Sequence, residues 1–268
     1  SVGDRAREVE SVTAVVVGAA GVVGLLIGSF LTVVTDRVPD GRSVVAPGSA
    51  CPACGHGLGA RDLVPLLSWL VRRGKCGHCG ANIGVEALVL ELATALVFVV
   101  LAVRFEQLWL LAAHCTLAAA LVALTAIDLR TRRLPREITH VAIALGTPLL
   151  VLAALVADEP RRIWTSLLGA SIATAVMLAL HLVSRESLGD GDVRLSPLLG
   201  LHLGWWNPGL ALVGLFFGFV LGAVAGIAMM LVGRAGRHTA IPFGPFLAVG
   251  ALVALFIGQD FVDVVMVR

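Results

Sequence analysis

Apolar runs of about 20 residues recur from residue 12 to the end of the chain, and they leave few folds open to it. A helix needs about 20 mostly apolar residues to cross a bilayer, and backbone in lipid must satisfy its own hydrogen bonds. With 58% hydrophobic and 14% charged residues, the composition excludes an ordinary soluble domain. The sequence therefore predicts an all-α polytopic membrane protein embedded in the lipid bilayer.

The spacing of these runs predicts where the helices lie and which side each loop faces. We expect helices at 12–35, 83–103, 107–127, 138–157, 163–184, 207–233 and 240–266, with a shorter apolar piece at 193–204. Alternate polar connections carry fourteen of the 20 Lys and Arg residues, namely Arg37, Arg42, Arg61, Arg72, Arg73, Lys75, Arg130, Arg132, Arg133, Arg136, Arg185, Arg194, Arg234 and Arg237. Basic loops stay on the cytoplasmic side. For both Arg194 and Arg234 to lie inside, the 193–204 piece must cross or re-enter, which predicts about eight crossings with both termini outside.

One long polar stretch interrupts the apolar pattern and divides the chain. We expect residues 1–35 to form an N-terminal tail and the first transmembrane helix, 36–82 to form a cytoplasmic loop domain, and 83–268 to form the main membrane domain. The first apolar run is too long for a cleaved signal peptide and should remain as a helix. The net charge of +2 is small, so no nucleic-acid partner is predicted.

Four cysteines in the 36–82 stretch form two C-x-x-C pairs, Cys51 with Cys54 and Cys76 with Cys79, and 21 residues separate the pairs. Two such turns complete the tetrahedral four-thiolate shell that zinc prefers. Disulfides are the alternative, but a loop on the reducing cytoplasmic side argues against them. His56 and His78 could substitute as ligands, although we expect them to be spectators. Four protein ligands leave no open position for water, so we expect a structural zinc.

Two acidic clusters border apolar segments on the predicted cytoplasmic side. Asp128 ends the third helix, and Asp190 and Asp192 precede the 193–204 piece. Carboxylates at membrane depth are costly and mark functional sites by default, although loop carboxylates paired with nearby arginines are the alternative. Two carboxylates from different helices share a proton, so one can activate water while the other acts as an acid, as in aspartic proteases. Gly189 and Gly191 would let a peptide backbone approach closely.

Only one of the two neighbouring acids should meet Asp128. In a helix, residues two apart point about 200° away from each other. Asp192 lies nearer the apolar segment and is the expected partner, whereas Asp190 should be solvated and paired with Arg194. In a later helix, glycines at 214, 218, 222 and 226 form a smooth face, which we interpret as a close-packing surface.

Several sequence blocks, in order, resemble the bacterial type IV prepilin peptidases, which fall within the wider group of G-x-G-D membrane aspartyl proteases. The blocks are G-S-F-L-T-V-V-T-D-R-V-P at Gly28 to Pro39, the two cysteine pairs, D-L-V-P-L-L-S-W-L at Asp62 to Leu70, A-I-D at Asp128, G-D-G-D-V-R-L at Gly189 to Leu195, and I-P-F-G-P-F-L at Ile241 to Leu247. This resemblance implies that Asp128 and Asp192 are the catalytic pair, with Gly189, Gly191 and Arg194 supporting the motif.

The resemblance also implies the substrate and the compartment. The substrate would be a prepilin or pseudopilin precursor with a short basic leader, serving type IV pili or type II secretion, and cleavage would occur at the cytoplasmic face of the bacterial inner membrane. Many relatives then methylate the new N-terminus with S-adenosylmethionine. Two departures bear on that second activity: Thr32 stands where the family usually has Asn, and Glu86-Ala87-Leu88 replaces Arg-Tyr-Pro.

Two other classes of protein fit parts of the pattern. A proton-coupled transporter could use Asp128 and Asp192 as an ion relay, but it predicts internal repeats, and we find no convincing one. A non-catalytic membrane assembly factor could use the zinc loop to dock a partner. The sequence predicts no oligomeric state.

Overall fold

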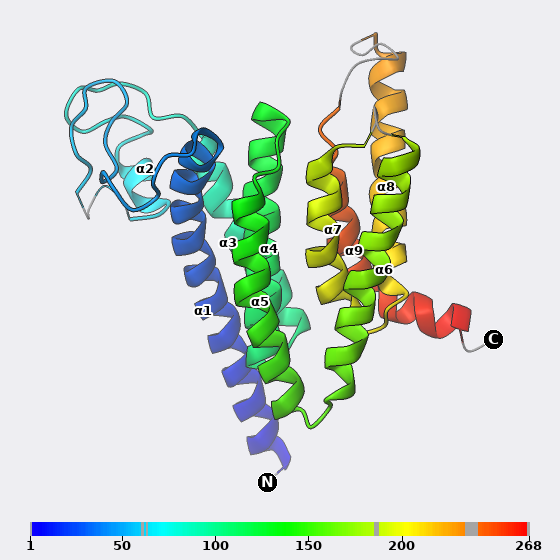
Figure 1. Cartoon of the computed structure of the whole chain (residues 1–268). Coiled ribbons are helices and arrows are strands. Elements are labelled where there is room, and N and C mark those ends of the chain that lie inside the picture. The colour runs from blue at the N-terminus through cyan, green and yellow to red at the C-terminus, as the bar shows by residue number, and fades with distance from the viewer. Residues whose placement is uncertain (1, 60–61, 63, 185–187, 234–240, 267–268) are drawn as a thin grey trace. The chain divides into compact units, whose positions relative to one another are not determined.

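The computed structural model describes residues 2–59, 62, 64–184, 188–233 and 241–266, with side chains from 12 to 256 within these ranges (Figure 1). Regular structure in these ranges is helical apart from two isolated β-bridges. The chain forms two compact units, Ser1–Glu106 and Gln107–Arg268. The predicted all-α membrane fold is therefore confirmed. Arg61, Arg185, Arg234 and Arg237 lie outside the described residues.

The first unit is built on two long helices that lie side by side, α1 (Val2–Arg37) and α3 (Glu86–Arg104). Between them in sequence come the 3₁₀ turn η1 (Val38–Asp40) and the short helix α2 (Leu67–Val71). Two glycines of α1 allow backbone-to-backbone approach: a Cβ at Gly28 would lie 2.5 Å from the Cα of Glu91, and one at Gly24 would lie 2.6 Å from the Cα of Ala95. Small residues are what allow apolar helices to pack this closely.

The second unit contains α4 (Leu108–Thr131), α5 (Arg136–Val156), α6 (Arg161–Val183), α7 (Asp190–Gly204), α8 (Leu210–Leu231) and α9 (Gly244–Met266). Helix α4 packs against α5, α7 and α9 and is the most buried of the long apolar helices. Leu117, Leu121 and Leu124 on α4 and Leu195 and Leu198 on α7 are almost fully enclosed. The core of this unit therefore surrounds α4.

Glycines join the later helices into tight pairs. A Cβ at Gly169 of α6 would lie 2.4 Å from the carbonyl oxygen of Gly200 of α7, and a Cβ at Gly250 of α9 would lie 2.4 Å from the backbone nitrogen of Gly218 of α8. A Cβ at Gly214 would lie 2.6 Å from Cδ1 of Leu203. The predicted packing role is thus confirmed for Gly214, Gly218 and Gly222, whereas a Cβ at Gly226 would make only ordinary contact.

Six helices among the described residues are long and apolar enough to span a membrane: α1, α3, α4, α5, α6 and α8. Helix α7 has 15 residues and so is about 22 Å long, which is less than the ~30 Å hydrocarbon core. Within the described side chains of α9, an apolar run covers Gly244–Phe256. The chain is a multi-pass membrane protein, and the count of about eight crossings stays a prediction.

Candidate functional site

The two cysteine pairs form matching turns in the first unit. The N–H of Gly55 donates to the carbonyl of Cys51, and the N–H of Gly80 donates to the carbonyl of Cys76. Both glycines have positive φ, 70° and 72°, a conformation that side-chain-bearing residues rarely adopt. The same turn is therefore built twice, and each copy presents two sulfurs.

The four sulfurs meet in one cluster. All lie within 4.8 Å of one another, and Sγ of Cys51 is 3.9 Å from Sγ of Cys79. A tetrahedral zinc with Zn–S bonds of about 2.3 Å requires sulfurs about 3.8 Å apart, so the spacing fits that ion. The four cysteines are free thiols, so each sulfur is available as a ligand. The cluster could therefore hold a metal ion.

The two histidines of the cysteine turns stand apart from this cluster. His56 and His78 are exposed and stack face to face, with ring centroids 4.4 Å apart. The group of candidate ligand atoms contains the four sulfurs and neither imidazole.

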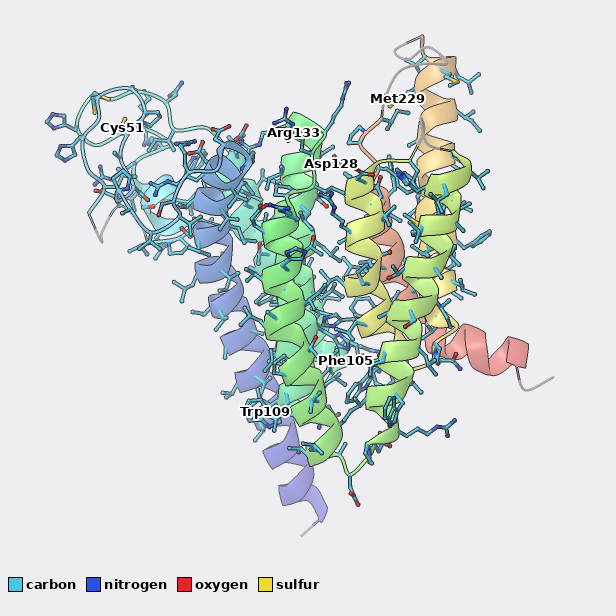
Figure 2. All side chains as sticks on the ribbon, viewed as in Figure 1. Cys51, Phe105, Trp109, Asp128, Arg133 and Met229 are labelled. Carbon is cyan, nitrogen blue, oxygen red and sulfur yellow. The ribbon has the colours of Figure 1, made fainter. Side chains whose placement is uncertain are left out.

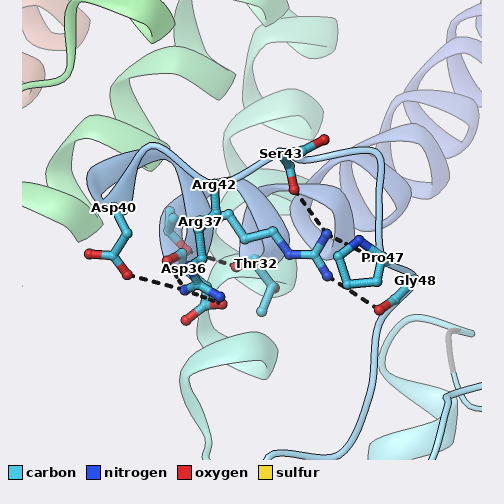
Figure 3. A network of polar contacts seen from close by, with 9 residues as sticks. Thr32, Asp36, Arg37, Asp40, Arg42, Ser43, Pro47 and Gly48 are labelled. Carbon is cyan, nitrogen blue, oxygen red and sulfur yellow. Dashed lines mark hydrogen bonds and ion pairs between the residues drawn. The ribbon is translucent and has the colours of Figure 1, made fainter.

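Polar contacts fix the chain where it leaves α1 and enters the cysteine-containing loop. The guanidinium of Arg37 donates to the carbonyls of Ser43 and Pro47, at 3.1 and 2.7 Å, and to that of Gly48 (Figure 3). Arg42 pairs with Asp36 and Asp40. The D-R-V-P block thus orders the start of the loop.

A buried carboxylate ties the far side of the same loop to α3. Glu91 is 6% exposed, and its Oε2 accepts a 2.7 Å hydrogen bond from the backbone N–H of Leu66. Leu66 has a positive φ of 61° and immediately precedes α2. Because a buried carboxylate needs donors, this contact holds the D-L-V-P-L-L-S-W-L block against α3.

Asp128 lies near the C-terminal end of α4, whereas Trp109 lies at the other end of that helix (Figure 2). The carboxyl is 4% exposed, and its Oδ2 accepts a 2.9 Å hydrogen bond from the backbone N–H of Gly244, the first residue of α9. The C-terminus of a helix disfavours negative charge and an N-terminus favours it. The N-terminus of α9 therefore stabilises negative charge on Asp128, whereas the C-terminal end of α4 does not.

The G-D-G-D segment forms the first turn of α7 and separates its two acids. Asp192 is 7% exposed, and its Oδ1 has no hydrogen-bond partner among the described residues. Asp190 is exposed, and its Oδ1 lies 3.2 Å from Nε2 of His181 on α6. Asp190 is therefore solvated, as predicted, but the ion pair that the structure gives it is with His181 and not with the expected Arg194.

The second unit brings Asp128 and Asp192 together. The two carboxyls interact electrostatically, and Leu134 lies beside the backbone that holds both. A Cβ at Gly191 would lie 2.8 Å from Cβ of Leu134, and one at Gly244 would lie 3.0 Å from its Cδ2. Two neighbouring carboxyls in apolar surroundings do not both ionise easily, so they can share the proton that acid–base chemistry needs.

Sequence reasoning from chemistry alone missed Gly244 and Leu134. A glycine carries no functional side chain, and a leucine after an arginine-rich turn resembles ordinary packing. The available signal was the position of Gly244 in the I-P-F-G-P-F-L block and of Leu134 six residues after Asp128.

Comparisons with known proteins agree with this arrangement. The model of the bacterial peptidase A24 N-terminal domain matches residues 22–105, and that of the type IV leader peptidase family matches residues 115–231. These matches fall in the first and second units respectively. No solved structure gives a significant match.

Several curated relatives share the name prepilin leader peptidase/N-methyltransferase. The protein of Myxococcus xanthus is 39% identical over 225 residues, which is 81% of this chain and 64% of the relative, so the chain spans slightly less than two thirds of that protein. The protein of Bacillus subtilis is 30% identical over 90% of this chain and 94% of the relative, and that of Stutzerimonas stutzeri is 33% identical over 89% and 90%. The chain therefore belongs to the type IV leader peptidase family.

Proposed function

We propose that the chain is an aspartyl endopeptidase that removes the leader from type IV prepilin-like precursors. The observation that carries this proposal is the juxtaposition of two buried carboxyls, Asp128 and Asp192, contributed by different helices of a membrane protein. Its relatives are named for the same reaction. We further propose that the chain lies in the bacterial inner membrane with the aspartates toward the cytoplasm, since basic residues such as Arg130 and Arg133 follow Asp128.

The hydrogen-bond partners suggest a role for each aspartate. Asp128 receives the N–H of Gly244 at the start of α9, which stabilises its ionised form. Asp192 also bonds to backbone, that of Gly189, but its buried Oδ1 has no hydrogen-bond partner among the described residues, and a proton on this carboxyl avoids leaving a charge there. Asp128 then takes a proton from water as the water oxygen attacks the scissile carbonyl carbon. Asp192 gives its proton to the carbonyl oxygen, which forms a tetrahedral diol. As the diol collapses, one of its hydroxyls returns a proton to Asp192, Asp128 gives its proton to the amine nitrogen, and the C–N bond breaks to release the leader.

The 36–82 loop acts in this proposal as a structural element organised by zinc. The sulfur spacing supports a closed four-thiolate site, which leaves no position for a metal-bound water. Zinc would supply folding energy to the loop and take no part in cleavage. The contact between Glu91 and Leu66 then joins the ordered loop to α3.

N-methylation of the new N-terminus is the second activity that the relatives' names suggest. The described part of the first unit contains a cavity of about 400 Å³ between α1 and the 44–49 segment, large enough for a small molecule. Among its lining residues the charged one is Arg37, whose guanidinium donates to the carbonyls of Ser43 and Pro47. We assign no step of methyl transfer to this cavity.

A cleavage assay tests the proposal. Purified full-length chain is incubated with a prepilin and with S-adenosylmethionine, and the product mass is measured. We expect loss of the leader mass with wild type, and no loss with Asp128→Asn or Asp192→Asn at equal amounts of folded protein, because a dyad needs both carboxyls. Either variant retaining a substantial fraction of the rate would rule out the two-aspartate mechanism. Metal-dependent prepilin binding without cleavage would instead support an assembly factor, and the added mass of a methyl group would report the second activity.

A further inference from the structure

Helices α4 and α7, which carry the two aspartates, share a second polar contact. His114 of α4 and His202 of α7 are both 0% exposed, and their Nδ1 atoms lie 3.3 Å apart. The imidazole rings are tilted, with centroids 5.4 Å apart. Neither residue belongs to a motif in the sequence or to the aspartate site.

A hydrogen bond between two facing Nδ1 atoms restricts the tautomers of both histidines. A hydrogen bond between them requires one ring with a proton on Nδ1 and the other with a bare Nδ1, so the two histidines must be opposite tautomers. If both Nδ1 atoms carried protons, the donors would face each other. A buried polar group without its partner is costly in apolar surroundings. Losing this contact would therefore cost His202 the Nδ1 partner that the structure gives it.

The pair is closed off on the side of α5. A Cβ at Gly146 would lie 2.9 Å from Nε2 of His202, so the absence of a side chain at Gly146 makes room for the ring. That Nε2 has no hydrogen-bond partner within the described ranges. Within the described residues, the polar contact of the His202 ring is therefore the one with His114 of α4.

The two polar contacts lie at opposite ends of the α4–α7 interface. Asp128 follows His114 by 14 residues, about 21 Å of helix, and Asp192 precedes His202 by 10 residues, about 15 Å. Because α4 and α7 run in opposite directions, Asp128 and Asp192 lie at one end of their interface, and His114 and His202 lie at the other. A second fixed point on each helix opposes sliding and rotation, which one contact alone would allow.

We propose that His114 and His202 are positioning residues that set the register of α4 against α7 and thereby hold Asp128 and Asp192 in reach of each other. The importance of this register for catalysis rests on the proposed function. The register itself does not depend on the proposed function, because it can be measured without any cleavage. The histidines touch neither substrate nor reacting atoms.

Cross-linking measures the register directly. Cysteines are placed at both aspartate positions by Asp128→Cys and Asp192→Cys in the full chain with Cys115→Ala. A short reagent with two thiol-alkylating groups joins them, and the linked peptides are quantified by mass spectrometry. We expect His114→Leu to slow cross-linking by about fivefold or more, since a lost net hydrogen bond is worth about that factor. His114→Asn should retain most of the rate, because its side-chain amide can replace Nδ1. The matched control is Thr116→Val, whose hydroxyl bonds to Ala112 within α4.

Activity provides the second readout, in the chain with native aspartates. His114→Leu should lower kcat for prepilin cleavage and leave KM near wild type, with recovery in His114→Asn. If single leucine variants fold poorly, His114→Leu with His202→Leu removes both polar groups together, and cross-linking should still be slow. Wild-type cross-linking in that double variant, or in a folded His114→Leu chain, overturns the proposal. Slow cross-linking alongside active Asp128→Asn enzyme would support the register and refute the proposed aspartate mechanism.

Discussion

Substituting Gly244 with alanine isolates the contact that α9 makes with Asp128. A Cβ at this position would lie 2.9 Å from Oδ2 of Asp128 and 3.0 Å from Cδ2 of Leu134, so the carboxyl must move by a few tenths of an ångström. The 2.9 Å hydrogen bond from the Gly244 N–H would then lengthen or break. Hydrogen bonds to charged groups contribute about 1.5–3 kcal/mol, which corresponds to a loss of about 10- to 150-fold in kcat.

The assay compares kcat for prepilin cleavage in Gly244→Ala and Gly226→Ala at equal folded protein. At Gly226 the nearest atom to a Cβ is Cδ1 of Ile241, at 3.4 Å, and alanine favours a helix over glycine by about 1 kcal/mol. This control should keep a rate within about twofold of wild type. If Gly244→Ala also kept about half of the wild-type kcat or more, the Gly244 contact would have no catalytic importance.

Three further perturbations test other parts of the molecule. Asp190→Asn should keep at least about a third of the cleavage rate under conditions where Asp192→Asn shows none, because an exposed pair contributes little; equal loss in both variants would place both acids in the site. Purified chain should contain about one zinc, and Cys51→Ser should lose it while the membrane helices stay inserted; negligible zinc in wild type, prepared without chelators, would contradict this. Glu91→Ala should speed proteolysis of the 36–82 loop more than Glu91→Gln does, since glutamine keeps an acceptor for the Leu66 N–H; equal rates would refute that tie.

The membrane helices were predictable because bilayer thickness imposes their length, and each predicted run lies within or close to an observed helix. The cysteine cluster was predictable because two C-x-x-C turns carry their geometry locally. The pairing of Asp128 with Asp192 was expected from the sequence, but other pairings between helices were not predictable. His181 reaches Asp190, and His114 reaches His202, through packing that no local pattern encodes. Likewise, hydropathy marks 193–204 as a short apolar piece but does not show whether it crosses the bilayer or re-enters it.

The glycine contacts described above also determine which parts of the second unit can move. Helices α6 and α7 touch backbone to backbone at Gly169 and Gly200, and α8 and α9 do so at Gly218 and Gly250. Such contacts leave no flexible side chain to absorb a displacement, so each pair should move as a rigid hairpin. The contacts that α4 makes with α7 and α9 are sparser. Any opening that admits a prepilin helix should therefore occur along α4, where it would separate Asp128 from Asp192 and keep water activation off until the hairpins close again.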